Sequence, residues 1–298
     1  MMTLVAYLVL CLPFHFVPAP LSAQAQDAKR ITVLYDAFGP PSTLIRDWGF
    51  SALVEYGGKR ILFDAGNDAG ILAHNVEKLG VDLKRLDALV VSHRHGDHTS
   101  GLTYVFDVHP GLPAYAPADG AAFGGQIPAG FLAREPGLPK ELRYFDGEAP
   151  PRFVAGTPWG DRASFTAVAQ TKEIFPGFFV LTTRSEKPGT FEMNEVSLAI
   201  RTPRGLAVVV GCSHPGVEKI LAEAANIDPK LYTVTGGFHL VMAPEEEVRR
   251  VAGVLHDDLK VERVAPGHCT SELGFAVFLE RFGERFDKAG VGAVLALP

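Results

Sequence analysis

A seven-residue segment, S-H-R-H-G-D-H at positions 92–98, contains three of the chain's ten histidines together with an aspartate. It follows the short apolar run L-D-A-L-V-V-S, which is typical of a buried strand. Side chains two residues apart on an extended chain project to the same side, so His93 and His95 are expected to point together. The glycine that follows allows a sharp turn, which presents Asp97 and His98 in the same region.

These four side chains predict a metal site. Imidazole nitrogens and carboxylate oxygens are suitable ligands for Zn(II), Mn(II) and Fe(II). Four such groups are too many for one catalytic ion that keeps an open position, so the segment favours part of a two-metal site. A histidine cluster without metal is the weaker alternative, because the spacing is tight and lies at a strand end.

The rest of the chain predicts two groups of strands, each followed by helices. The sequence is 47% hydrophobic over 298 residues, which is enough to bury a substantial core. A Gly57-Gly58 pair between two alternating runs, Ser51–Tyr56 and Arg60–Asp64, predicts a β-hairpin. Further strands are expected over 30–38, 86–92, 178–184, 196–202, 205–213, 231–237 and 261–268, and helices over 71–80, 216–227 and 244–259. This order is typical of two sheets packed together with helices outside.

Residues 107–161 have a different character. They are rich in proline and glycine and show no sustained periodicity, which predicts a long loop insertion within one domain over residues 26–298. Phe123, Tyr144 and Trp159 are candidate walls of a substrate site in this range, although aromatic side chains more often pack in the core.

The first 25 residues predict a secretory leader. Their apolar run, residues 4–12, is too short to cross a bilayer, and Ala23-Gln24-Ala25 resembles a cleavage site. We therefore expect cleavage after Ala25, export to the periplasm and no stable membrane insertion afterwards. No lysine or arginine precedes the apolar run, so an uncleaved anchor or a different start site is the alternative.

The charge of the chain limits its partners. A formal net charge of −6 provides no basic surface for nucleic acid, which argues against a nuclease of polymers. A small-molecule substrate is expected instead, and nothing in the sequence predicts an oligomeric state.

Several motifs resemble one known family. The 92–98 segment matches the H-x-H-x-D-H signature of the metallo-β-lactamase superfamily, L-F-D-A-G resembles its early aspartate motif, and A-P-G-H-C-T its late histidine motif. The resemblance implies an αββα sandwich, with two packed mixed β-sheets and helices on the outer faces. More narrowly, D-W-G-F-S-A-L-V-E-Y-G-G-K-R-I-L-F-D-A-G-N, V-V-V-G-C-S-H-P-G-V and T-G-G-F-H-L resemble a subgroup named after an archaeal dihydropterin-dependent aminobenzene-phosphate synthase.

The resemblance implies His93, His95, Asp97, His98 and His268 as metal ligands. Ligand chemistry and placement at strand ends add His214 and His239 to the expected set. One ion is expected on His93, His95 and His214, and the other on Asp97, His98 and His268. Two Zn(II) ions are expected, with Mn(II) or Fe(II) as alternatives.

One position departs from the family pattern. The strand that ordinarily ends in a metal-bridging aspartate ends here in Cys212-Ser213-His214. His214 is expected to supply a missing histidine. Either Cys212 takes the bridging region or His239 completes the shell. Asp64 and Cys212 are otherwise expected to support the ligands from behind.

The expected activity is hydrolysis of an ester, lactone, amide or phosphoester bond by a metal-activated hydroxide, with Asp97 orienting the nucleophile or moving a proton. A pterin-type group transferase of the same subgroup, and a non-catalytic metal-containing binding or sensing protein, are the alternatives. A Ser213–His214 nucleophile pair is not expected, because adjacent strand residues face opposite sides.

Two further expectations concern histidines and cysteines elsewhere. His74, His109 and His256 are expected to lie outside the site. Cys212 and Cys269 each lie within two residues of an expected ligand, so their sulfur atoms are expected to approach each other, and export would permit a disulfide.

Overall fold

The computed structural model describes residues 28–119, 123, 137–143, 159–185 and 193–298. The predicted leader and Tyr144 lie outside these residues. Within them, the strands form two mixed sheets.

The first sheet has the strand order β13-β1-β2-β3-β4-β5-β6 in the described part of the chain. Its strands are antiparallel from β13 to β3 and parallel from β3 to β6. The predicted hairpin is confirmed, with Tyr56 opposite Lys59 across the two glycines. The bounds are β1 (Arg30–Tyr35), β2 (Ser51–Tyr56), β3 (Lys59–Phe63), β4 (Ala88–Val90), β5 (Pro113–Pro117), β6 (Ser164–Val168) and β13 (Val294–Ala296).

The second sheet has the order β12-β11-β10-β9-β8-β7 in the same described residues. Strands β7 to β10 are antiparallel, and β10 to β12 are parallel. The bounds are β7 (Lys172–Phe175), β8 (Phe178–Arg184), β9 (Asn194–Thr202), β10 (Gly205–Val210), β11 (Leu231–Gly237) and β12 (Arg263–Gly267).

Alternating side chains divide the core into three layers. Val209 of β10 packs between the sheets against residues such as Val33 and Ile61, whereas Val208 and Val210 face the helices outside the second sheet. A third apolar cluster lies between the first sheet and its own helices. Because β10 is buried on both faces, it is apolar at nearly every position and shows no polar alternation.

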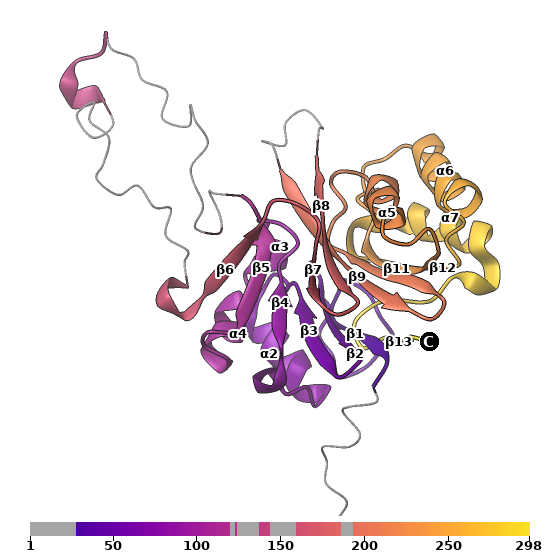
Figure 1. The fold of residues 1–298 in the computed structure, drawn as a ribbon, viewed down its shortest axis with the longest axis horizontal. Coiled ribbons are helices and arrows are strands. Elements are labelled where there is room, and N and C mark those ends of the chain that lie inside the picture. The colour runs from indigo at the N-terminus through magenta and orange to yellow at the C-terminus, as the bar shows by residue number, and fades with distance from the viewer. Residues whose placement is uncertain (1–27, 120–122, 124–136, 144–158, 186–192) are drawn as a thin grey trace, which may run out of the picture.

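Helices cover both outer faces, as Figure 1 shows: α2 and α4 lie beside the first sheet, and α5, α6 and α7 beside the second. The αββα architecture expected from the sequence is confirmed. The helices are α2 (Ala69–Lys78), α3 (Gly96–Thr99), α4 (Leu102–Val108), α5 (Val217–Ala225), α6 (Glu245–Gly253) and α7 (Glu272–Phe282). Short 3₁₀ turns occupy Leu83–Arg85, Lys140–Leu142, Gly160–Arg162, His268–Thr270 and Gly283–Arg285, and a π-helical turn occupies Val254–Asp258.

Four strands and three helices were not expected from the sequence, namely β5, β6, β7, β13, α3, α4 and α7. Strand β5 lies inside the range predicted as a loop insertion. Its sequence, P-A-Y-A-P, carries prolines only at its two ends, where a missing backbone donor disturbs the sheet least. Proline content therefore concealed a strand of the sheet.

Among the residues that the structure describes, no helix is long and apolar enough to cross a membrane.

Candidate metal centre

The predicted ligands all follow the carboxyl ends of strands. His93, His95, Asp97 and His98 come after β4, with the last two on the short helix α3. The remaining ligand residues come from the second sheet: Cys212 and His214 after β10, His239 after β11 and His268 after β12. Parallel strands place their carboxyl ends at one edge of a sheet, which is where open α/β sheets bind ligands.

Backbone strain is concentrated at this edge. In the described part of the chain, six residues other than glycine have a positive φ, and four of them belong to the site or its support: Asp64 (55°), Ser213 (62°), His239 (51°) and His268 (48°). Such conformations cost of order 1–3 kcal/mol each and persist only where surrounding contacts impose them. The strain indicates that the fold holds these side chains in one fixed arrangement.

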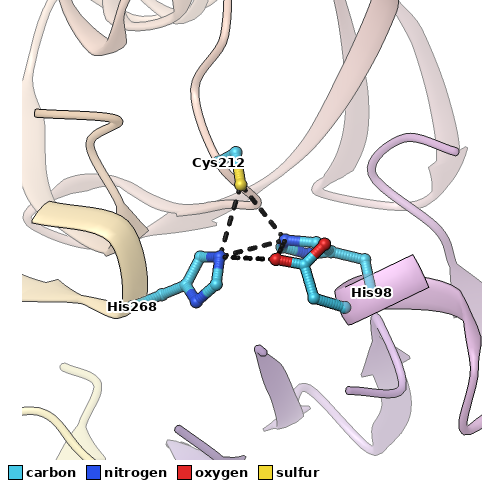
Figure 2. A group of neighbouring side chains, drawn as sticks. His98, Cys212 and His268 are labelled. Carbon is cyan, nitrogen blue, oxygen red and sulfur yellow. Dashed lines mark hydrogen bonds and ion pairs between the residues drawn. The ribbon is translucent and has the colours of Figure 1, made fainter. Parts of the chain in front are cut away.

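One group of four donors has the dimensions of a tetrahedral site. The sulfur of Cys212 lies 3.2 Å from His98 Nε2 and 3.3 Å from His268 Nε2, and the two nitrogens are 3.3 Å apart. Asp97 Oδ2 lies 3.4 Å from the same nitrogen of His268 and 3.8 Å from that of His98. Ligands bound at 2.0–2.3 Å to a tetrahedral ion would be roughly 3.3–3.7 Å apart. Figure 2 shows His98, Cys212 and His268 converging from three separate segments.

A second group consists of three histidines. The ligand nitrogens of His93, His95 and His214 all lie within 4.8 Å of one another, and His93 Nε2 is 3.1 Å from His95 Nδ1. The His214 ring centroid lies 4.8 Å from each of the other two. The two groups are adjacent, because the rings of His93 and His98 have centroids only 4.3 Å apart.

His239 lies in a third set, with Cys212 and Cys269. Its ring also approaches that of His214, with centroids 4.1 Å apart. The two cysteines are close together, as expected, and in the structure both are free thiols without a disulfide. For Cys212 the sequence left open a place in the bridging region or behind the ligands, and in the structure its sulfur lies among the donor atoms of the four-donor group.

A match to a family model identifies the family of this chain. A family model described as the metallo-beta-lactamase superfamily matches residues 49–268, which is most of the chain. The chain belongs to the metallo-β-lactamase superfamily.

Relatives of this superfamily member cover nearly its whole length. It is 28% identical to a 7,8-dihydropterin-6-methyl-4-(beta-D-ribofuranosyl)-aminobenzene-5'-phosphate synthase of Methanocaldococcus jannaschii, over 91% of this chain and 97% of that protein. Tm1679, a solved metal-dependent hydrolase of the β-lactamase superfamily, is 26% identical, with a TM-score of 0.68, 90% of this chain covered and 98% of that one. A diphosphatase from the PhnP family (16% identity, TM-score 0.52, 90% and 99% covered) shares the fold.

The buried carboxylate of Asp64 orients one histidine in each group of this superfamily member. It lies 2.7 Å from His98 Nδ1, so that nitrogen carries the proton and Nε2 presents its lone pair to the four-donor group. Asp64 also accepts the hydroxyl of Ser92 at 2.7 Å, and the Ser92 oxygen in turn lies 2.9 Å from His93 Nδ1. By the same reasoning His93 presents Nε2 to the three-histidine group. Asp64 therefore contacts His98 directly and His93 through Ser92.

Replacing Asp64 with asparagine is expected to weaken zinc binding by about 10- to 100-fold, because an amide donor would face groups that need an acceptor. Chelator competition measures the affinity, and circular dichroism checks the fold. Asp68→Asn is the matched control, since Asp68 only caps α2 through the Ile71 N–H (2.8 Å) and asparagine caps equally well. Unchanged zinc affinity in the Asp64 variant would refute the orienting role.

Two further buried carboxylates hold the backbone of the donor segments. Glu195 accepts the N–H groups of Ser213 and His214, each at 2.8 Å. Asp36 accepts the N–H of His268, with both oxygens at 3.2 Å. Burial raises the pKa of Glu195 to about 8 and that of Asp36 to about 7. Sequence reasoning missed both residues; the only signal was an acidic residue at the edge of an otherwise apolar strand.

The protonation states of His93 and Asp97 suit metal binding. Burial, reinforced by His98 and His214, holds the pKa of His93 well below its ordinary value, and neutral imidazole is the form that binds metal. Burial alone would raise the pKa of Asp97, but the hydrogen bond to His268 and the electrostatic influence of the nearby imidazoles outweigh it and hold that pKa well below its usual range. Asp97 is therefore ionised at neutral pH.

The donor atoms fit a cation better than they fit one another. Three of them, on His98, Cys212 and His268, lie at hydrogen-bond distance from each other, although the lone pair of His98 already points inward. Nδ1 of His239 and Nδ1 of His268 are buried without a hydrogen-bond partner among the described residues. Neutral imidazole and carboxylate groups, with a cysteine that binds as its thiolate, are typical ligands of a divalent metal site in this arrangement.

The remaining candidates lie elsewhere. His74 and His109 bond to the backbone oxygens of Thr43 (2.8 Å) and Leu83 (3.0 Å), and His256 bonds to Asp257, so these three lie outside the donor groups of the described residues.

Two candidate aromatic residues and Ser213 have contacts of their own. Phe123 and Trp159 pack against Phe165 in the outer core of the first sheet, with ring centroids 5.1 and 5.5 Å from it. The hydroxyl of Ser213 donates to the backbone oxygen of Gly237 at 2.7 Å, which leaves no serine–histidine nucleophile pair here.

Proposed function

We propose that this protein is a metal-dependent hydrolase that cleaves an ester, lactone, amide or phosphoester bond of a small molecule. The observation that carries the proposal is the pairing of a three-histidine group with an adjacent four-donor group. We propose two divalent ions, zinc first, with manganese or iron as alternatives. One would lie on His93, His95 and His214, and the other on the group that contains Asp97.

The two groups differ in a way that matters for chemistry. Three protein ligands leave a position for water or substrate, as in catalytic zinc sites, whereas four ligands close a tetrahedral shell. When bound, the ions would lower the pKa of a coordinated water and polarise the bond under attack.

Asp97 is the candidate catalytic residue of the chain itself. Its carboxylate is 19% exposed, while the neighbouring side chains of His98 and His268 are buried. An ionised carboxylate at this position is suited to orient the attacking water or to accept its proton. Oδ2 faces His268, so the second oxygen of Asp97 is the one assigned to that task.

Metal content and turnover test the proposal together. The purified protein is loaded with zinc, manganese or iron, and its metal is quantified. Each form is then assayed on a chromogenic ester, a lactone, a β-lactam and bis(4-nitrophenyl) phosphate. We expect about two equivalents of metal and hydrolysis of at least one substrate. Fewer than about half an equivalent after loading would overturn the metal site. Full loading with no turnover would favour the binding or sensing protein.

A pterin-type transferase is the second candidate, and the synthase that is 28% identical over nearly its whole length favours it. The predicted leader argues against it, because such a biosynthesis uses cytoplasmic intermediates. One assay separates the two activities. The protein is incubated with a pterin methyl diphosphate and a ribofuranosyl-aminobenzene phosphate, and the products are identified by mass spectrometry. A joined product indicates transfer, whereas a pterin alcohol with free diphosphate indicates hydrolysis.

A further inference from the structure

An exposed tryptophan lies directly against the four-donor group. Trp48 precedes β2, and its indole Nε1 donates to Asp97 Oδ2 at 3.1 Å. Its ring lies beside that of His268, with centroids 5.0 Å apart at 53°. Nevertheless Trp48 is 45% exposed, although a side chain of this size is ordinarily well buried. A large aromatic surface is therefore open to solvent at the edge of the candidate metal centre.

The backbone next to Trp48 is fixed to the same aspartate. The N–H of Phe50 donates to the Asp97 carbonyl oxygen at 3.2 Å. Gly49, at φ 149°, allows this close approach, because a Cβ there would lie 2.6 Å from the Asp97 carbonyl oxygen. Trp48 thus hydrogen-bonds to Asp97 through its side chain, and Phe50 does so through its main chain. One side-chain and one main-chain hydrogen bond therefore join this segment to Asp97.

We propose that Trp48 positions the Asp97 carboxylate and provides the wall on which a flat aromatic ring of the substrate stacks. The proposal rests on the proposed function and adds a substrate class to it, an aromatic ring joined to the bond that is cleaved. A preorganised indole face favours a flat ring over a saturated ring of similar size, because offset stacking adds to the burial of apolar area. The expected preference is about three- to tenfold in affinity.

Exposed apolar side chains also follow β11 of the second sheet, beside the segment that contains His268. The N–H groups of Leu240 and Val241 both donate to the carbonyl oxygen of Cys269, at 3.0 and 3.1 Å, so their loop lies beside the residue that follows His268. Val241 is 44% exposed and Met242 91% exposed. Such surface is better suited to an apolar substituent than to a highly charged one.

Two non-hydrolysable ligands of similar size test the stacking role. Phenylphosphonate and cyclohexylphosphonate share the same anionic group and differ in whether the ring is flat. Calorimetry on the zinc-loaded protein measures both affinities without requiring turnover. We expect phenylphosphonate to bind about three- to tenfold more tightly in the wild type, and the preference to vanish in Trp48→Leu. Equal affinities in the wild type, or the same preference in Trp48→Leu, would overturn the stacking role.

A conservative variant separates positioning from stacking. Trp48→Phe keeps a ring but removes the N–H donor to Asp97, so the ring preference should survive in it. The visible absorption of Co(II) bound to the four-donor group should shift in both Trp48 variants, because the Asp97 carboxylate is released. Spectra identical to wild type in both variants would overturn the positioning role. Melting temperatures in each variant distinguish these effects from misfolding.

The tryptophan content of the chain offers a direct reporter. The chain has two tryptophans, and Trp159 is only 7% exposed. In Trp159→Phe, Trp48 becomes the sole indole, and its fluorescence should be quenched when Co(II) binds beside it. The matched Trp48→Phe protein should show no comparable quenching. Quenching of Trp159 instead would contradict the placement of Trp48.

Failure of this proposal is distinguishable from failure of the proposed function. Hydrolysis of the substrate panel without any ring preference would remove only the role of Trp48. A ring preference in a metal-loaded protein that hydrolyses nothing would remove the hydrolase and leave Trp48 as a binding surface.

Discussion

Alanine in place of His95 is expected to reduce hydrolysis by more than about a hundredfold while the protein stays folded. His95 is one of only three imidazoles in the group that would leave a position open, so its loss removes a third of the ligands there. Even groups that merely orient ligands are worth about 10–100-fold in metal affinity or activity, and a ligand itself should exceed them. His95 is partly exposed and follows β4, so the fold should lose little stability. Steady-state kinetics, metal quantification and circular dichroism measure the three quantities.

The matched control is His74→Ala. His74 is also a partly exposed histidine, but its Nε2 bonds to the carbonyl oxygen of Thr43, and it belongs to none of the donor groups of the described residues. Metal content and turnover should match the wild type in this variant. If His95→Ala retained wild-type turnover and metal content, the assignment of the three-histidine group would be wrong.

Local patterns predicted the central elements of the fold well. Alternation about Gly57-Gly58 predicted the hairpin, and the apolar run before His93 predicted β4, because both signals depend only on neighbouring residues. Strand β5 escaped prediction because its end prolines imitate a loop. Helix α7 was also missed, although Ser271 caps it by accepting the Gly274 N–H at 3.0 Å.

The residues of the donor groups likewise differ in how far local sequence patterns predict them. The spacing of His93, His95, Asp97 and His98 predicted a cluster from one segment alone. Its contact with His268, 170 residues away, was expected only from the family resemblance, since no local pattern encodes it. The position of the Cys212 sulfur depends on how the two sheets pack together. The sequence alone therefore could not decide whether Cys212 takes the bridging region or supports the ligands from behind.

The supporting residues were hardest to anticipate. Glu195 and Asp36 are charged residue types that ordinarily occupy the surface, and only the folded chain shows that they hold backbone N–H groups of donor segments. The candidate aromatic walls, Phe123 and Trp159, pack in the outer core, as aromatic side chains more often do, while Trp48 lies beside the candidate metal centre. Whether an aromatic side chain lines a site or packs in the core depends on its exposure, and exposure is set by the tertiary structure.

Replacing Cys212 with serine is expected to remove the ion of the four-donor group selectively. The Cys212 sulfur lies 3.2–3.3 Å from nitrogens of His98 and His268, which is the spacing of donors around one ion. A serine hydroxyl stays protonated at neutral pH and is a poor ligand for zinc, so binding of this ion should weaken by more than about a hundredfold. Metal content should fall from about two equivalents to about one, with the three-histidine group still loaded.

Cobalt provides the spectroscopic signature of this ligand, because a thiolate bound to Co(II) gives an intense charge-transfer absorption that nitrogen and oxygen ligands lack. The wild type should show this absorption, and Cys212→Ser should lose it. Cys269→Ser is the matched control: the Cys269 sulfur is equally buried, but it bonds to the Cys212 carbonyl oxygen at 3.5 Å and lies outside the four-donor group. That variant should retain the absorption and both ions. An absorption that survives in Cys212→Ser and disappears in Cys269→Ser would assign the thiolate ligand to the other cysteine.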